Sequence, residues 1–148
     1  MSFAEKLRRG NFLITSEITP PVSLDPQALL DKALPLKGLA DAVNVTDGAS
    51  ARAAMDPLAA SALMMQAGVE PIMQLTCRDR NRIALQGAAI GAAALGVRAF
   101  LCLTGDDPTT GDQPETKGVF DIGSAQLMQT IADIGKGIQA RVEIGSVA

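Results

Sequence analysis

Two acidic residues stand directly after short apolar runs and are the first candidates for acid–base chemistry. Glu17 ends the segment FLITSE, and Asp106 follows Gly105 in FLCLTGD. A carboxyl group can give or take a proton when its surroundings set its ionisation. A lone glutamate in such a place is either solvated at a rim or held as an acid. The sequence has no histidine, which excludes histidine bases, and it predicts no metal site.

Further polar residues follow other apolar runs. The segment NVTDG presents Asn44, Thr46 and Asp47, although Asp47-Gly48 also suits a plain turn. The segment QLTCRDRNR places three arginines at the start of a predicted helix, where the helix dipole disfavours cations unless an anion lies nearby. Asp79 can offset part of that cost.

Strands and helices that alternate along the chain must position these residues. Short β-rich runs predict strands at 12–17, 42–46, 71–76, 99–103 and 141–146. Longer stretches predict helices at 26–36, 57–67, 80–95 and 123–139. This alternation is typical of βα units on a parallel sheet, whose sites lie at the C-terminal ends of the strands.

Helix boundaries have recognisable signals. Asp25 and Asp56 each precede a proline, which places a capping carboxylate before a residue that lacks an N–H group. Asp79 is the expected cap of the third helix. Gly68 and Gly96 stand where left-handed C-terminal caps are expected.

Composition narrows the class of protein. The 148 residues are 47% hydrophobic and 20% charged, which is ordinary globular usage, and we expect one α/β domain over 1–148. A net charge of −3 gives no reason to expect nucleic acid or an anionic membrane surface. No apolar run reaches spanning length, which favours a soluble, cytoplasmic protein. Cys77 and Cys102 lack CxxC spacing and are expected to be reduced thiols.

The segment GDDPTTGDQPETKG is rich in glycine, proline and acidic residues, so we expect a long functional loop without regular structure. Four βα units and a fifth strand make about half of a parallel (β/α)8 TIM-type barrel. We therefore expect the N-terminal half of a longer barrel rather than a complete five-stranded open sheet.

The motifs SEITPP, NVTDGASAR, QLTCRDRNR and LTGDDPTTGDQP occur in an order and spacing that resemble the methylenetetrahydrofolate reductase family. The resemblance covers nearly the whole chain. It implies an eight-stranded barrel that binds FAD at the strand ends. The implied reaction is reduction of 5,10-methylenetetrahydrofolate to 5-methyltetrahydrofolate with NADH or NADPH as electron donor. The implied partners are the folate substrate and either further copies of the chain or a missing C-terminal half.

The resemblance also implies site residues. Glu17 looks like the family's general acid toward the folate, and Asp106 like the aspartate that reaches the pterin and tunes the flavin. Besides Asp106, the implied cofactor-binding residues lie at strand ends or at a helix start: Thr46, Gln74, Thr104, Gly105, Gly123 and Ser124. Many relatives carry histidine at position 74 and arginine at position 104, so those contacts must be made otherwise here.

Two other functions stay open at this point. One is a noncatalytic pterin- or flavin-binding half-barrel that needs a partner chain. The other is a different pteridine-dependent one-carbon barrel enzyme, which would use the pterin without the flavin.

Overall fold

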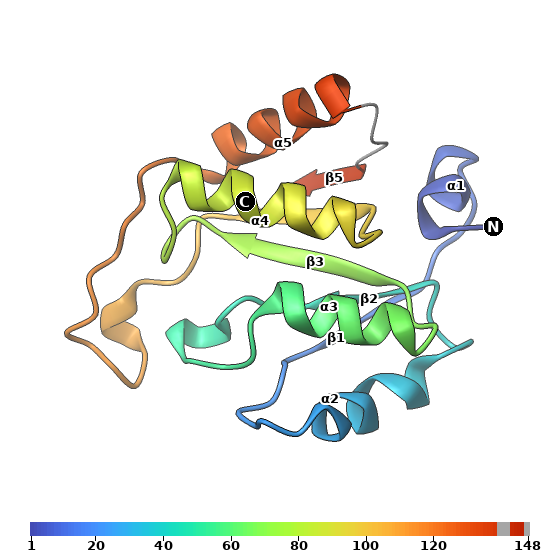
Figure 1. The fold of residues 1–148 in the computed structure, drawn as a ribbon, viewed down its shortest axis with the longest axis horizontal. Helices are drawn as coiled ribbons and strands as arrows, with labels where there is room; N and C mark the ends of the chain where they lie inside the picture. Colours follow the sequence, from blue (N-terminus) through green and yellow to red (C-terminus); the bar gives the residue numbers. More distant parts are fainter. Residues whose placement is uncertain (139–142, 147–148) are drawn as a thin grey trace.

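Five parallel strands form one sheet in which each strand pairs with the next one along the chain (Figure 1). The computed structural model describes residues 1–138 and 143–146. The strands are β1 (Thr15–Ile18), β2 (Ala42–Val45), β3 (Pro71–Thr76), β4 (Ala99–Leu103) and β5 (Glu143–Ser146). The order β1-β2-β3-β4-β5 confirms the predicted parallel α/β sheet.

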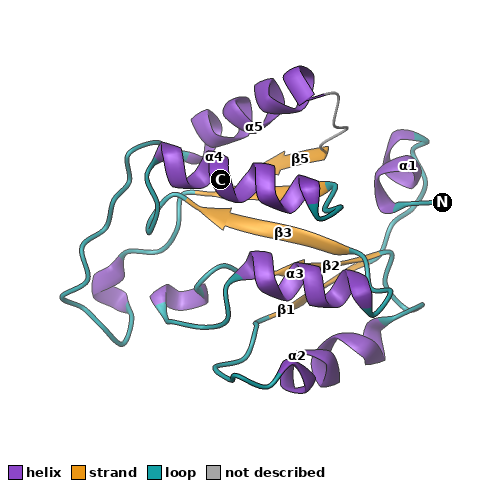
Figure 2. Cartoon of the chain, in the orientation of Figure 1, coloured by secondary structure: helices purple, strands orange, loops and turns teal. Residues whose placement is uncertain are grey.

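A helix follows each of the first four strands, as predicted (Figure 2). The helices are α1 (Phe3–Arg8), α2 (Pro26–Ala33), α3 (Pro57–Gln66), α4 (Arg82–Ala94) and α5 (Ser124–Ile138). Single 3-10 turns are η1 (Leu34–Leu36), η2 (Ala49–Ala51) and η3 (Pro108–Thr110). Because η3 lies inside the long loop after β4, the prediction that this loop has no regular structure is wrong over one turn.

Two of the predicted helix starts are confirmed and one is wrong. The Asp25 side chain accepts a hydrogen bond from the N–H of the second residue of α2, and Asp56 caps α3 in the same way. Asp79 does not cap α4, because Arg78 holds its carboxylate. Asn81 is the cap instead, accepting from the N–H groups of two residues in the first turn of α4 at 3.1 and 3.0 Å.

Helices α2 to α5 cover one face of the sheet. Alternate strand side chains, such as Val43 and Val45 on β2 and Met73 and Leu75 on β3, pack against these helices. Figure 1 shows α3 and α4 running along β3 on this face. The residues between them point to the opposite face, because successive side chains of a strand alternate.

Helix α1, which the sequence did not predict, closes one end of this second face. Phe3 packs against Ala42, Ile72 and Ala99, which lie at or near the beginnings of β2, β3 and β4. A capping box between Ser2 and the third residue of α1 starts the helix. The second face is therefore closed near the strand beginnings, and its polar residues lie toward the C-terminal ends.

The first strand is shifted from its predicted position. It begins at Thr15 rather than at position 12 and continues through Ile18. Its pairing starts where Thr15 meets Ala42, the first residue of β2, so earlier positions have no partner strand. Phe12 is accordingly 90% exposed. In the part of the chain that the structure describes, no helix has both the length and the apolar composition to cross a membrane.

Candidate functional site

A pocket of about 460 Å³ lies at the C-terminal ends of β1 to β4, on the face away from α2 to α5. It brings together six of the predicted site residues, which are Glu17, Thr46, Gln74, Thr104, Gly105 and Asp106. The lining residues are Glu17, Thr46, Asp47, Gly48, Ala49, Ser50, Gln74, Thr76, Arg78, Leu103, Thr104, Gly105 and Asp106. The strand-end rule therefore locates the pocket correctly.

The register of the sheet explains why these side chains converge. Glu17 pairs with Asn44, and Thr76 pairs with Leu103. Gln74 stands two positions before Thr76, so both side chains point to the same face. Because side chains alternate along β3, Met73 and Leu75 face the helices, whereas Gln74 and Thr76 face the pocket.

Glu17 and Gln74 make a direct contact across the pocket floor. The Gln74 amide nitrogen donates to Glu17 Oε2 at 2.9 Å. Gln74 is 5% exposed, whereas Glu17 is exposed within the described chain. The carboxyl group at the end of β1 is therefore open to a ligand and held from below by an amide of β3.

Asp106 lies on the opposite side of the pocket, at the end of a glycine turn. Gly105 has φ +100°, and a Cβ there would lie 2.9 Å from Arg78 Cβ and 3.1 Å from Thr76 Cβ. Only glycine fits this approach without strain. The turn presents the exposed Asp106 carboxylate, whose Oδ2 accepts from the Ser50 N–H group at 3.1 Å.

The loop that Asp106 contacts has a strained backbone. Ser50 and Ala51 have φ values of 57° and 54°, in the left-handed region that non-glycine residues rarely adopt. The loop after β4 packs against it so closely that a Cβ at Gly111 would lie 2.1 Å from the Ala51 carbonyl oxygen. Residues following β2 and β4 therefore hold one another in place beside the pocket.

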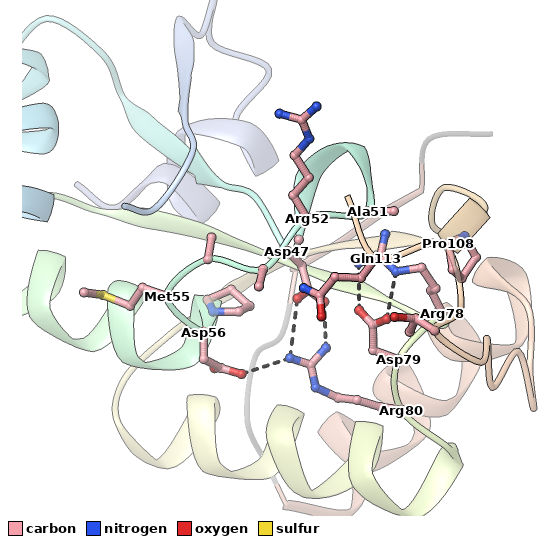
Figure 3. Close-up of a pocket in the computed structure, with 15 residues that line it drawn as sticks. Asp47, Ala51, Arg52, Met55, Asp56, Arg78, Asp79, Arg80, Pro108 and Gln113 are labelled. Carbon is pink, nitrogen blue, oxygen red and sulfur yellow. Dashed lines mark hydrogen bonds and ion pairs between the residues drawn. The ribbon is translucent and has the colours of Figure 1, made fainter. Parts of the chain in front are cut away.

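An ion cluster lies next to this pocket and supplies the anions that the arginines before α4 need (Figure 3). Asp47 Oδ2 lies 2.7 Å from Arg80 Nη1 and accepts the Thr76 N–H group at 2.8 Å. Arg80 also contacts Asp56, the cap of α3, at 2.9 Å. Burial alone would lower the pKa of Arg80, but its bonds to Asp47 and Asp56 outweigh burial and raise it. Asp47 is thus a structural anchor and more than a turn residue.

Arg78 has a partner of its own within the sequence motif. Its guanidinium donates twice to the Asp79 carboxylate, at 2.8 and 2.7 Å, and its pKa is raised chiefly by that contact. Arg82 pairs with Asp121 across the start of α4. The three arginines are therefore matched by carboxylates of the protein itself.

A comparison with protein families shows to which family this chain belongs. The family model described as methylenetetrahydrofolate reductase matches residues 2–143.

The chain belongs to the methylenetetrahydrofolate reductase family.

Comparison with curated proteins gives no significant match. Membership of the methylenetetrahydrofolate reductase family indicates a reductase-type function in folate one-carbon metabolism. The family is generally flavin-dependent, so the pocket can be tested for its fit to a flavin.

Two buried hydroxyl groups in the pocket at the strand ends lack hydrogen-bond partners among the described residues. They belong to Thr46 and Thr76, which are 5% and 3% exposed. An unsatisfied buried polar group costs about 1–3 kcal/mol, which a ligand offering a partner can recover. The pocket therefore fits a ligand with several polar atoms on its edge, as the flavin ring has.

Thr76 is a polar pocket residue that sequence reasoning missed. Its position on β3, two residues after Gln74 and therefore on the same face of the sheet, could have identified it. Gly123 and Ser124, by contrast, are not among the residues that line this pocket. The Gly123 N–H group donates to the Gln126 side chain at 3.1 Å, so one of the donors at the start of α5 already has a partner.

Cys77 and Cys102 are both buried free thiols, as expected. Burial raises the pKa of Cys77, and burial together with the neighbouring Cys77 raises the pKa of Cys102 to about 12. Neither thiol lines the pocket at the strand ends. They belong to the core beneath the helices.

Proposed function

We propose that this pocket binds FAD and that the protein reduces 5,10-methylenetetrahydrofolate to 5-methyltetrahydrofolate with NADH or NADPH. The observation that carries the proposal is one pocket, in a chain of the methylenetetrahydrofolate reductase family, that joins Glu17 to Asp106. Two carboxyl groups in different surroundings support a division of acid and base work. The exposed Glu17 accepts a hydrogen bond from the Gln74 side-chain amide, whereas Asp106 accepts one from the Ser50 backbone N–H group.

Residues of three neighbouring strand ends would hold the cofactor. Thr46 and Gln74 supply polar groups from β2 and β3, and the Gly105 turn lets the backbone come close from the end of β4. FAD, when bound, supplies the hydride transfer between the nicotinamide and the folate. The protein supplies the position of the substrate and the protons.

Glu17 is proposed as the general acid toward the folate. Its carboxyl group is exposed at the end of β1, so a ring nitrogen of a bound substrate can come within hydrogen-bond reach. A proton given to that nitrogen weakens its bond to the methylene carbon. The electrophilic carbon that results is the acceptor of hydride.

Asp106 is proposed to orient the pterin. Its carboxylate can accept hydrogen bonds from N–H groups of the pterin, because one oxygen is directed to Ser50 and the other has no partner within the described chain. A negative charge at this edge also makes a neighbouring flavin harder to reduce. Gly123 and Ser124 remain proposed contacts for the cofactor phosphates, at the start of α5.

The sheet is proposed to belong to a (β/α)8 barrel. The strand order runs without reversal, and α2 to α5 cover one face. This is the arrangement of a barrel wall, whereas a doubly wound sheet reverses its strand order and carries helices on both faces. A cytoplasmic location is a further part of the proposal.

Glu17→Gln is the decisive experiment. We expect purified protein with added FAD to show flavin absorbance near the usual visible band. The variant should keep flavin reduction by the nicotinamide and lose folate reduction by about 10²-fold or more, the scale of a lost general acid. Glu115→Gln changes an exposed carboxyl outside the pocket and should leave both half-reactions unchanged.

Three results would contradict the proposal in different ways. Equal loss in both half-reactions would make Glu17 structural. Flavin binding without folate turnover would leave a binding module that needs a partner chain. Folate binding by a colourless protein would favour a pteridine-dependent enzyme without flavin.

A further inference from the structure

The hydrogen bond between Glu17 and Gln74 joins strands that are not neighbours. Strand β2 lies between β1 and β3, so the two side chains reach one another across β2. The Gln74 amide nitrogen lies 2.9 Å from Glu17 Oε2. The hydrogen bond joins two side chains inside the pocket, from residues that are far apart in the sequence.

The direction of this hydrogen bond depends on the charge of Glu17. An ionised carboxylate can only accept, so the Gln74 NH₂ group must face it. Gln74 Oε1 then accepts no hydrogen bond from the described residues and is left for a donor on a ligand. A protonated Glu17 can instead donate to Gln74 Oε1, which turns the amide and directs its NH₂ group away from Glu17.

The other charged groups of the pocket are already engaged. Asp47 is held by Arg80 and by the Thr76 N–H group, and Arg78 is held by Asp79. Asp106 accepts from the Ser50 N–H group. Among the described residues, therefore, Gln74 supplies the side-chain donor that reaches Glu17, while Asp47, Arg78 and Asp106 set the background charge.

We propose that Gln74 is a positioning residue for Glu17, and that the orientation of its amide follows the proton on Glu17. The site would then present an acceptor to a ligand when Glu17 is charged and a donor when Glu17 is protonated. The part of this inference that concerns proton delivery rests on the proposed function. The contact between Glu17 and Gln74, and its dependence on the charge of Glu17, are independent of the proposed function.

Nuclear magnetic resonance tests the coupling in the protein without cofactor. We expect the Gln74 side-chain ¹H–¹⁵N signals to shift with pH in step with the Glu17 carboxyl ¹³C signal. The shift should disappear in Glu17→Gln. Gln129 is a matched control, because it donates to the exposed Asp133 at 3.0 Å, away from the pocket. Its signals should follow pH equally in both proteins. Gln74 signals that ignore the titration of Glu17 would overturn the proposal.

Kinetics then separates this inference from the proposed function. Gln74→Met should slow the folate half-reaction by about tenfold or more, and should add little to the loss in Glu17→Gln, since residues acting as a unit are not additive. Additive losses would overturn the positioning role. Coupled signals in a protein that reduces no folate would refute the proposed function alone. Uncoupled signals in an active reductase would refute the positioning alone.

Discussion

Replacing Arg80 by methionine measures how far the ion cluster beside the pocket stabilises the fold. Arg80 joins Asp47, at the end of β2, to Asp56, the cap of α3. Its side chain is 20% exposed, whereas that of Asp47 is 5% exposed. Methionine keeps much of the apolar stem and removes the charge. Asp47 would then be a buried carboxylate with one remaining donor, the Thr76 N–H group.

The expected loss follows from that geometry. Removing one partner of a fully buried ion pair costs about 3–5 kcal/mol, because the other charge is left without compensation. The contact with the more exposed Asp56 adds less than about 1 kcal/mol. Since Arg80 is partly solvated and Asp47 keeps one hydrogen bond, we expect a loss of about 2–4 kcal/mol. In a protein of this size that lowers Tm by roughly 3 °C per kcal/mol.

Urea denaturation followed by circular dichroism gives the free energy of unfolding, and a thermal melt gives Tm. Arg82→Met is the matched control, because it removes an arginine at the same end of α4 whose pair with Asp121 is exposed. The control should lose much less stability. In Asp47→Asn the buried charge is gone, so a second change, Arg80→Met, should cost less than it does in the native protein. Equal losses in the Arg80 and Arg82 variants, or a loss below about 1 kcal/mol for Arg80→Met, would refute the assigned role of burial.

Three further predictions concern other parts of the molecule. The side-chain and backbone contacts of Arg82 lower the pKa of Asp121 from 3.8 to about 2, so this contact stabilises the fold above about pH 4 and is lost as pH falls toward 2; urea melts across this range should show less acid dependence in Asp121→Asn. The buried Cys102 thiol, with its pKa raised to about 12, should react with a thiol reagent only as fast as the protein opens. Gly111→Ala should destabilise the protein by about 1–3 kcal/mol, because its Cβ would meet the Ala51 carbonyl oxygen.

Each of these predictions has a result that would contradict it. An unchanged acid profile in Asp121→Asn would contradict the first prediction. Rapid labelling of Cys102 in native buffer would show that the core beneath the helices is open. Gly123→Ala is the comparison for Gly111, since a Cβ there meets nothing within 4 Å. Similar melts for the two alanine variants would contradict the close packing of the loops.

Local signals in the sequence were enough for much of the fold. The strands 71–76 and 99–103 were predicted to the residue, because each is a compact apolar run between turn residues. Asp25 and Asp56 were identified as caps because an aspartate before a proline leaves little choice of conformation. The strand-end rule likewise predicted that Glu17 and Asp106 share a pocket.

The misses depend on side-chain contacts and strand pairings that the apolar pattern does not contain. Asp79 and Asn81 are both good capping residues, and the choice of Asn81 follows from the ion pair that Arg78 makes with Asp79. The hydrogen bond from Gln74 to Glu17 joins side chains of β3 and β1 across β2, so it depends on the order of the strands in the sheet. The limits of β1 depend on where β2 begins, which the apolar pattern around Phe12 does not contain.

The long connection after β4 has a consequence for how the fold can vary. Strands β1 to β4 are joined by shorter links than the one that joins β4 to β5. Loop closure entropy grows slowly, by about 0.6 kcal/mol for each doubling of loop length. An insertion within 112–117, whose residues are exposed and follow the closely packed Gly111, should therefore cost the sheet little stability. That part of the loop can change in length while the strands that carry Glu17 and Gln74 stay as they are.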